Sequence, residues 1–190
     1  MLWFYESFFP VLWIVFLIYW QVKAFNTKST QRLEPVSSRI IRVLVFLIVI
    51  ILLSTTWIPL PWLYVQLWPV GLWPFWLGAA VTIAGLLFAV WAREHLGRNW
   101  SRSVTIKQDH ELITSGPYAV VRHPGYVAGI QLCVGIALCL GSLWALIPAG
   151  LATALLILRT CWEDQTLQAE LPGYKEYTQR VQYKLVPGVW

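Results

Sequence analysis

The sequence predicts an all-α integral membrane protein with five transmembrane helices and the N-terminus outside. Three observations predict this class. The 190-residue chain is 58% hydrophobic and only 12% charged, about half the charged fraction of a soluble domain. Its mean hydropathy is +0.61. Its apolar residues form runs of the length that a bilayer requires, about 20 residues. The basic residues between these runs all fall on one side when five spans are assumed.

The first two spans are expected at residues 8–25 and 40–57. Glu6 lies just outside the first span. The start of the chain shows neither the basic residues nor the small-residue cleavage site of a signal peptide. The second span ends where Pro59 and Pro61 follow, because proline removes a helical hydrogen bond.

The third span is expected at residues 74–91, and the fourth and fifth share the apolar block 127–158. This block is too long for one crossing. Gly141 and Ser142 interrupt it, so we expect a tight hairpin of two helices.

Charge placement supports this map and gives an orientation. The segments 23–42, 93–122 and 159–184 hold all fourteen basic residues, and five spans place them on one side of the bilayer. The positive-inside rule makes that side cytoplasmic. The net charge of +5 is thus explained by topology, without nucleic acid. The expected location is a membrane, the cell membrane in a prokaryote.

Residues 1–92 form the three N-terminal spans, and residues 93–190 carry almost every ionisable side chain with catalytic potential. The hairpin returns the chain to its starting face, so segments 93–126 and 159–190 can meet there. His123 precedes Pro124, which disfavours helical geometry at His123. We therefore expect His123 at the entrance of the fourth helix, although a simple basic anchor at a helix start is the alternative.

Arg159 and Glu163 are four residues apart and share one face of a helix. A surface ion pair is one interpretation. Glu163 lies only a few residues beyond an apolar run, where an ionised carboxylate is costly without a partner or a function. A paired or ligand-facing Glu163 is therefore the sharper hypothesis.

Other chemistry finds little support in the sequence. Cys133, Cys139 and Cys161 lie in or beside apolar runs and are interpreted as packing residues. His95 and His110 have no ligand-like spacing, so no metal site is expected. Nucleotide-binding, metalloprotease and hydrolase motifs are missing from the sequence. The residues alone therefore indicate a polar site at the membrane interface, without naming a reaction.

Two groups of residues carry a resemblance to a known family. The sequence resembles the isoprenylcysteine carboxyl methyltransferase family and its relatives among phospholipid methyltransferases, in the form of a short prokaryotic member. The resemblance covers the second half of the chain. Its residues are Gly116-Pro117-Tyr118, Arg122-His123-Pro124-Gly125-Tyr126 and Gly129, then Glu163-Asp164, Leu167, Pro172-Gly173-Tyr174, Tyr177 and Arg180.

The resemblance implies a methyltransferase that uses S-adenosylmethionine, releases S-adenosylhomocysteine and methylates the carboxylate of an isoprenylcysteine-like lipid entering from the bilayer. It makes residues 93–190 the catalytic region. Cofactor contacts are expected from Gln108, His110, Leu112, Ile113, Tyr118, His123, Pro124, Tyr126, Gly129 and Glu163. Catalytic or substrate-binding roles are expected for Glu163, Arg122, Arg159, Arg180 and Asn99, with Trp100 shaping the mouth of the site.

Three alternatives remain open at this point. The first is N-methylation of a phospholipid amine such as phosphatidylethanolamine, which must shed a proton and so needs a base. The second is a membrane reductase that uses NADPH. The third is a membrane module without enzymatic activity.

Overall fold

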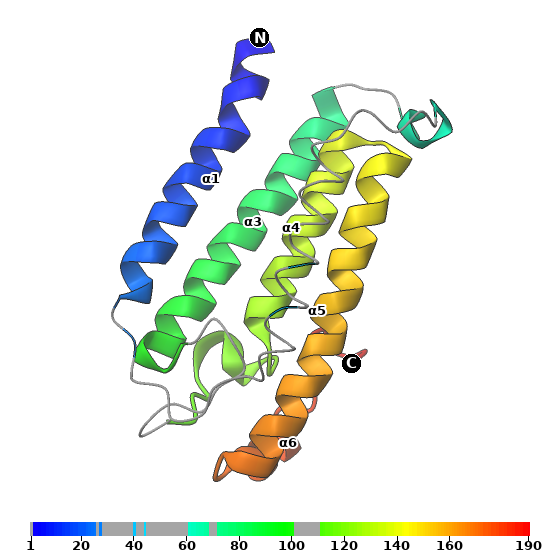
Figure 1. The fold of residues 1–190 in the computed structure, drawn as a ribbon. Coiled ribbons are helices and arrows are strands. Elements are labelled where there is room, and N and C mark those ends of the chain that lie inside the picture. Colours follow the sequence, from blue (N-terminus) through cyan, green and yellow to red (C-terminus); the bar gives the residue numbers. More distant parts are fainter. Residues whose placement is uncertain are drawn as a thin grey trace.

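The computed structural model describes residues 2–25, 27, 40, 44, 61–68, 72–100 and 111–190. Four long helices run side by side: α1 (Leu2–Ala24), α3 (Leu72–Leu96), α4 (Pro124–Leu140) and α5 (Leu143–Glu170) (Figure 1). Shorter helices are η1 (Pro61–Tyr64), η2 (Gly97–Asn99), η3 (Gly116–Ala119) and α6 (Tyr174–Arg180). The described residues thus form an all-α structure, as predicted. The predicted span 40–57 lies outside them, apart from Ile40 and Leu44.

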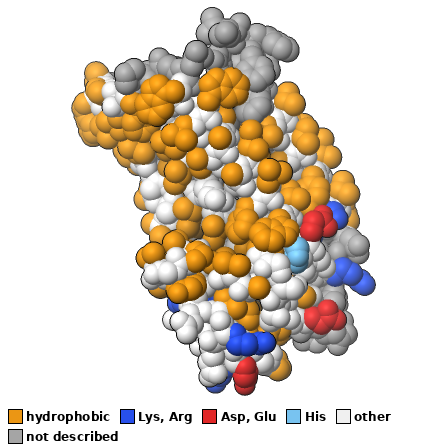
Figure 2. Space-filling view, turned by 180° about the vertical axis from the view of Figure 1, so that it is seen from behind, with side chains coloured by type: hydrophobic (Ala, Val, Ile, Leu, Met, Phe, Trp, Pro, Cys, Tyr) orange, Lys and Arg blue, Asp and Glu red, His pale blue; other side chains and the backbone are white. Residues whose placement is uncertain are grey.

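Two of the described helices have the length that a bilayer requires, and the surface of the bundle is apolar. The segments Trp73–Asn99 and Leu143–Glu170 are long and apolar enough to cross a membrane, and Pro10–Ala24 and Pro124–Leu140 are shorter apolar helices. Large apolar side chains on α1, including Val15 and Val22, are more than half exposed. On the face that Figure 2 shows, hydrophobic side chains predominate below the grey, undescribed atoms and down through the middle, and the charged side chains lie in the lower half. The count of five spans and the cytoplasmic orientation stay predictions.

The predicted break between the fourth and fifth spans is confirmed. Gly141 ends α4 in the left-handed conformation, with φ at 64°, a geometry that favours glycine. Ser142 then caps α5, because its hydroxyl accepts a hydrogen bond from the Ala145 N–H. The segment around η1 covers this turn, where the Leu67 N–H donates to the Gly141 carbonyl at 2.8 Å.

Small residues allow α3 and α4 to approach closely. A Cβ atom on Gly135 would overlap the Thr82 hydroxyl and lie 2.8 Å from the Gly78 carbonyl oxygen. Thr82 itself is fully buried and donates to the same Gly78 carbonyl at 2.8 Å. Close contact through small residues is a common mode of helix packing in membranes. It places the first turn of α4 beside the last turns of α3.

The helix α5 continues past the apolar block that ends at Leu158 and reaches Glu170. Beyond it the chain folds back through α6, where Leu171, Tyr174, Tyr177 and Val181 form a small buried cluster. Leu112 and Leu167 pack against this cluster. The segments 111–123 and 171–185 therefore meet at the end of the bundle opposite the α4–α5 turn (Figure 1).

Candidate active site

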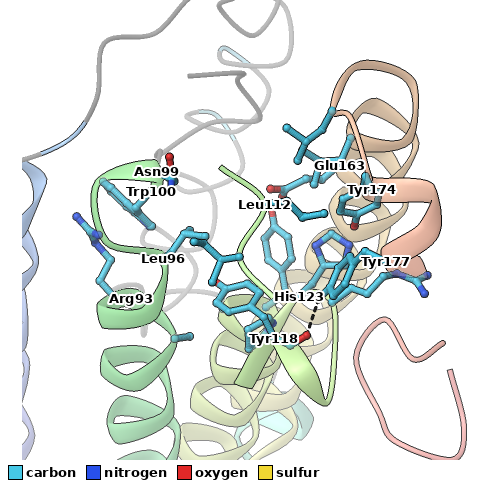
Figure 3. A pocket seen from close by; sticks show the side chains of 18 of the residues that line it. Arg93, Leu96, Asn99, Trp100, Leu112, Tyr118, His123, Glu163, Tyr174 and Tyr177 are labelled. Carbon is cyan, nitrogen blue, oxygen red and sulfur yellow. Dashed lines mark hydrogen bonds between the residues drawn. The ribbon is translucent and has the colours of Figure 1, made fainter. Parts of the chain in front are cut away.

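A cavity of about 400 Å³ opens at this end of the bundle, between the last turns of α3 and the extension of α5 (Figure 3). A ligand pocket commonly has a volume of about 300–1,000 Å³. The structure brings most of the predicted site residues into its wall. These are Asn99, Trp100, Leu112, Ile113, Tyr118, Arg122, His123, Pro124, Tyr126, Arg159 and Glu163.

Two of the described predicted residues, Arg180 and Gly129, do not line the cavity. Gln108 and His110 lie outside the described residues. Arg180 is exposed on α6. Gly129 faces α5, because a Cβ atom there would lie 3.0 Å from Leu156 Cδ1. At Gly129 the structure therefore shows close packing between helices and no contact with the cavity.

Other lining residues were not predicted. Trp20, Ala89 and Ala92 belong to the N-terminal region 1–92, so both predicted regions contribute walls. Arg93 also lines the cavity. Its position at the end of an apolar run was the one feature of the sequence that could have indicated a role at this site. Tyr174 and Tyr177 also line it; they belong to the family pattern but were given no role.

His123 occupies the predicted place at the start of α4. It is the N-cap residue, with φ at −126° and ψ at 62°, and Pro124 is the first residue of the helix. The backbone N–H groups of Arg122 and His123 each donate, at 3.0 Å, to carbonyls of the C-terminal segment, those of Tyr183 and Lys184. The predicted position of His123 at the entrance of the fourth helix is confirmed, and the C-terminal segment holds it in place. Its contact with a cofactor stays a prediction.

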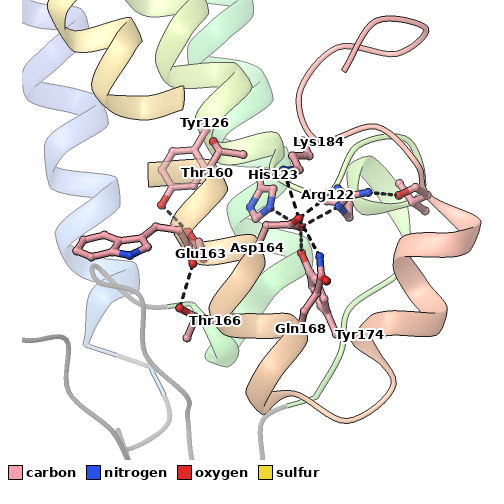
Figure 4. A network of polar contacts seen from close by, with 12 residues as sticks. Arg122, His123, Tyr126, Thr160, Glu163, Asp164, Thr166, Gln168, Tyr174 and Lys184 are labelled. Carbon is pink, nitrogen blue, oxygen red and sulfur yellow. Dashed lines mark hydrogen bonds and ion pairs between the residues drawn. The ribbon is translucent and has the colours of Figure 1, made fainter. Parts of the chain in front are cut away.

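Asp164 is the centre of a buried polar network (Figure 4). Its side chain is only 3% exposed. Its carboxylate accepts hydrogen bonds from Arg122 Nε at 2.9 Å, the Tyr174 hydroxyl at 2.9 Å and Gln168 Nε2 at 3.1 Å. His123 Nε2 lies 3.4 Å away and Lys184 Nζ 3.6 Å away. A buried carboxylate is costly unless cations and donors surround it, and here both are present.

Arg122 extends this network to the C-terminal segment. Its Nη1 donates to the carbonyls of Val181 at 2.8 Å and Gln182 at 2.9 Å, and its Nη2 donates to Asp164 at 3.3 Å. Most of its donors are thus engaged within the protein. A substrate carboxylate would have to compete with these contacts for Arg122.

Glu163, the neighbour of Asp164, points to a different partner. The Tyr126 hydroxyl donates to Glu163 Oε2, and Arg159 Nε donates to the same hydroxyl at 2.8 Å. All three side chains line the cavity. Arg159 and Glu163 therefore both lie at the hydroxyl of the half-buried Tyr126 in the cavity wall, whereas the alternative interpretation was a surface ion pair.

The tyrosines of this region are held in the protonated form. Burial raises the pKa of Tyr177 to about 12. Burial, together with the nearby carboxylates, also raises the pKa of Tyr118 and of Tyr174 well above the usual value. The Tyr177 hydroxyl donates to the Tyr118 carbonyl at 2.7 Å. At neutral pH these hydroxyls are donors that shape the site, and they are poor bases.

The model of the phospholipid methyltransferase family matches residues 73–171. Because this match covers half of the chain and includes both halves of the site, the chain belongs to that family. The resemblance predicted from the motif residues is thereby confirmed.

One solved structure and two bacterial proteins are similar to this chain. The fold is similar to that of a eukaryotic intramembrane Ras methyltransferase, isoprenylcysteine carboxyl methyltransferase, with a TM-score of 0.55 and 25% identity over 62% of this chain and 43% of that one. The chain is 31% identical over 109 residues to the nickel-cobalt-cadmium resistance protein NccN of Alcaligenes xylosoxydans xylosoxydans. It is 34% identical over 89 residues to the cobalt-zinc-cadmium resistance protein CzcN of Cupriavidus metallidurans. These matches cover 55% and 45% of this chain, and the chain spans 49% and 40% of the two relatives.

Proposed function

We propose that this chain is an integral membrane methyltransferase that uses S-adenosylmethionine and methylates the carboxylate of an isoprenylcysteine-like lipid. One observation carries the proposal. The segment Arg122–Tyr126 and Glu163, which are far apart in the sequence, share the wall of one cavity. Family membership and the similarity to isoprenylcysteine carboxyl methyltransferase support the same chemistry.

The residues of the cavity fit S-adenosylmethionine. The Glu163 carboxylate suits an ammonium or a ribose hydroxyl. The Tyr118 ring and the apolar side chains of Leu112 and Ile113 suit a flat adenine. Tyr126 and His123 would complete this contact surface. The bound cofactor supplies an activated methyl group on a sulfonium.

The protein then has to align the acceptor and exclude water. A carboxylate acceptor is already ionised at neutral pH, so no general base is required. Arg159 carries a guanidinium in the cavity wall, fixed by its bond to Tyr126, and a guanidinium binds a carboxylate well. We assign it to the acceptor in preference to Arg122, whose donors hold Asp164 and the C-terminal segment. Asn99 accepts from the Glu111 N–H at 3.4 Å and would shape the mouth.

A second candidate is N-methylation of a phospholipid amine, and the family model's own description favours it. An amine must lose a proton during transfer, so a base is needed. Glu163 or His123, which both line the cavity, would serve as that base. Rates that rise with pH through one essential deprotonation would favour this reaction, whereas carboxylate methylation requires no such step.

The names of the two bacterial relatives refer to metal resistance. Within residues 2–25, 61–68, 72–100 and 111–190, no cluster of three or more His, Cys, Asp or Glu side chains could hold a metal ion.

Calorimetry with the detergent-purified protein tests the proposal. We expect saturable binding of S-adenosylhomocysteine and none of NADPH. Methyl transfer would then be compared between N-acetyl-S-farnesylcysteine and phosphatidylethanolamine. Transfer to the first acceptor supports carboxylate methylation, and transfer to the second alone supports the amine reaction. Binding of NADPH alone, or of neither ligand, would contradict the methyltransferase assignment.

A further inference from the structure

Arg93 occupies an unusual place for an arginine near the end of a membrane helix. Only 3% of its surface is exposed. Its Nη1 donates to the Gly97 carbonyl at 2.6 Å, just after α3, and its Nη2 donates to the Lys23 carbonyl at 2.7 Å, in the last turn of α1. Carbonyls at helix C-termini lack partners within the helix and attract cations. One guanidinium therefore joins the ends of two helices that are far apart in the sequence.

The same guanidinium supports a tryptophan of the cavity wall. The Arg93 Cζ atom lies 4.4 Å from the centre of the Trp100 ring, within the range of a cation–π contact. Trp100 meets Trp20 of α1 edge-on, with ring centres 5.6 Å apart. Both rings line the cavity, and Arg93 lies against Trp100 at its α3 edge (Figure 3).

A second link between α1 and α3 lies outside the cavity. Lys23 Nζ and Glu94 form an ion pair at 2.8 Å, but their side chains are 42% and 46% exposed. Exposed pairs contribute little to stability. The buried Arg93 is therefore the stronger of the two links.

The cavity wall near Arg93 differs in character from the opposite wall. Apart from Arg93 and Asn99, the lining residues from α1, α3 and the short segment after α3 are apolar: Trp20, Ala89, Ala92, Leu96 and Trp100. The opposite wall carries the polar groups of Tyr126, Arg159 and Glu163. An apolar wall beside a polar one suits an acceptor with a hydrocarbon body and an ionised head.

We propose that Arg93 is a positioning residue that holds Trp100 and Trp20 in place as the wall against which the apolar part of the acceptor packs. This inference rests on the proposed function. It assigns Arg93 no contact with the cofactor, so cofactor affinity and acceptor affinity separate when Arg93 is changed.

The test compares Arg93→Met with Arg98→Met, an identical change at a nearby exposed residue that does not line the cavity. In Arg93→Met, the KM for N-acetyl-S-farnesylcysteine should rise about tenfold, as expected for the loss of a hydrogen bond to a charged group. The Kd for S-adenosylhomocysteine should stay within about twofold of wild type, because the proposal assigns Arg93 no contact with the cofactor. Arg98→Met should change neither.

A double-mutant cycle identifies Trp100 as the residue through which Arg93 acts. Trp100→Leu should raise the same KM, and adding Arg93→Met to it should raise the KM little further. Independent, multiplying effects of the two changes would overturn the proposal. If Arg93→Met fails to fold, Arg93→Lys replaces it in the same cycle. This variant keeps the positive charge but loses the planar guanidinium that donates to two carbonyls.

Hydrogen exchange gives a readout that needs no turnover. Arg93→Met should speed exchange in the last turn of α1 and at Gly97–Trp100, and Arg98→Met should not. Unchanged exchange in Arg93→Met would overturn the proposal even in a protein with no methyl transfer. Faster exchange in a protein that binds no S-adenosylhomocysteine would support the link that Arg93 makes between α1 and α3 and would reject the proposed function.

Discussion

Replacing Asp164 by asparagine should destabilise the protein strongly. The substitution keeps the size of the side chain and removes its charge. In the wild type the carboxylate receives two bonds from Arg122, one from Tyr174 and one from Gln168. An amide has one acceptor oxygen, and its NH₂ group would face donors of Arg122 or Gln168. Arg122, whose side chain is 6% exposed, would be left without its counter-ion.

The structure sets the size of this effect. Removing one partner of a buried ion pair costs about 3–5 kcal/mol, since the other charge stays buried. For a chain of this length, each kcal/mol lowers the unfolding temperature by about 2–4 °C. The expected shift for Asp164→Asn is thus roughly 6–20 °C.

Thermal unfolding in detergent, followed by tryptophan fluorescence, measures this shift. Glu176→Gln is the matched control, because Glu176 is an exposed acid on α6 and its change should leave the unfolding temperature nearly unaltered. Tryptic cleavage after Lys184 should also become faster in Asp164→Asn, because the C-terminal segment loses its anchor. An unfolding temperature within about 2 °C of wild type, less than 1 kcal/mol, would refute this account of the network.

Three further predictions address cofactor binding, the stability of the fold at alkaline pH, and helix packing. Glu163→Ala should weaken S-adenosylhomocysteine binding at least about tenfold in calorimetry without lowering the unfolding temperature; wild-type affinity would remove Glu163 from the site. The unfolded chain releases the Tyr177 proton near pH 10 and the folded protein near pH 12. The free energy of unfolding should therefore fall as pH rises between these values, by about 1.4 kcal/mol per unit. Tyr177→Phe should show a shallower fall in thermal unfolding across that range, and an equal slope would contradict the assignment. Gly135→Ala should cost about 1–3 kcal/mol because its Cβ atom would overlap Thr82. Gly150→Ala, which meets nothing within 4 Å, is its control in the same melts, and equal unfolding temperatures for the two variants would refute the packing argument.

Local chemistry made part of this fold predictable. The break at Gly141 and Ser142 follows from a glycine that can adopt positive φ and a serine that can cap a helix. The position of His123 follows from the proline after it. Both predictions depend on neighbouring residues alone, so a single sequence was sufficient.

The division of roles between Glu163 and Asp164 was not predictable in the same way. Consecutive residues on a helix point about 100° apart, since one turn takes 3.6 residues. One acid therefore meets Tyr126 in the cavity wall, and the other meets Arg122 in the interior. The choice depends on how α5 is rotated against α4, which tertiary packing decides.

The role of Arg93 was hidden for a related reason. In the sequence it is a basic residue at the end of an apolar run, as the positive-inside rule expects. Its partner carbonyl at Lys23 lies 70 positions earlier in the chain. A buried clamp and an interfacial charge have the same sequence signature, and only the arrangement of α1 beside α3 distinguishes them.

The bonds from Arg122 and His123 to residues 181–184 have a consequence for biosynthesis. A ribosome produces the cavity-lining segments of α4 and α5 before the segment that fastens them. Until residues 181–184 emerge, the Arg122 guanidinium lacks its carbonyl acceptors, and the pocket is without one of its supports. The nascent protein would thus insert its helices before residues 181–184 support the pocket, so that ligand affinity should report whether these residues have been synthesised.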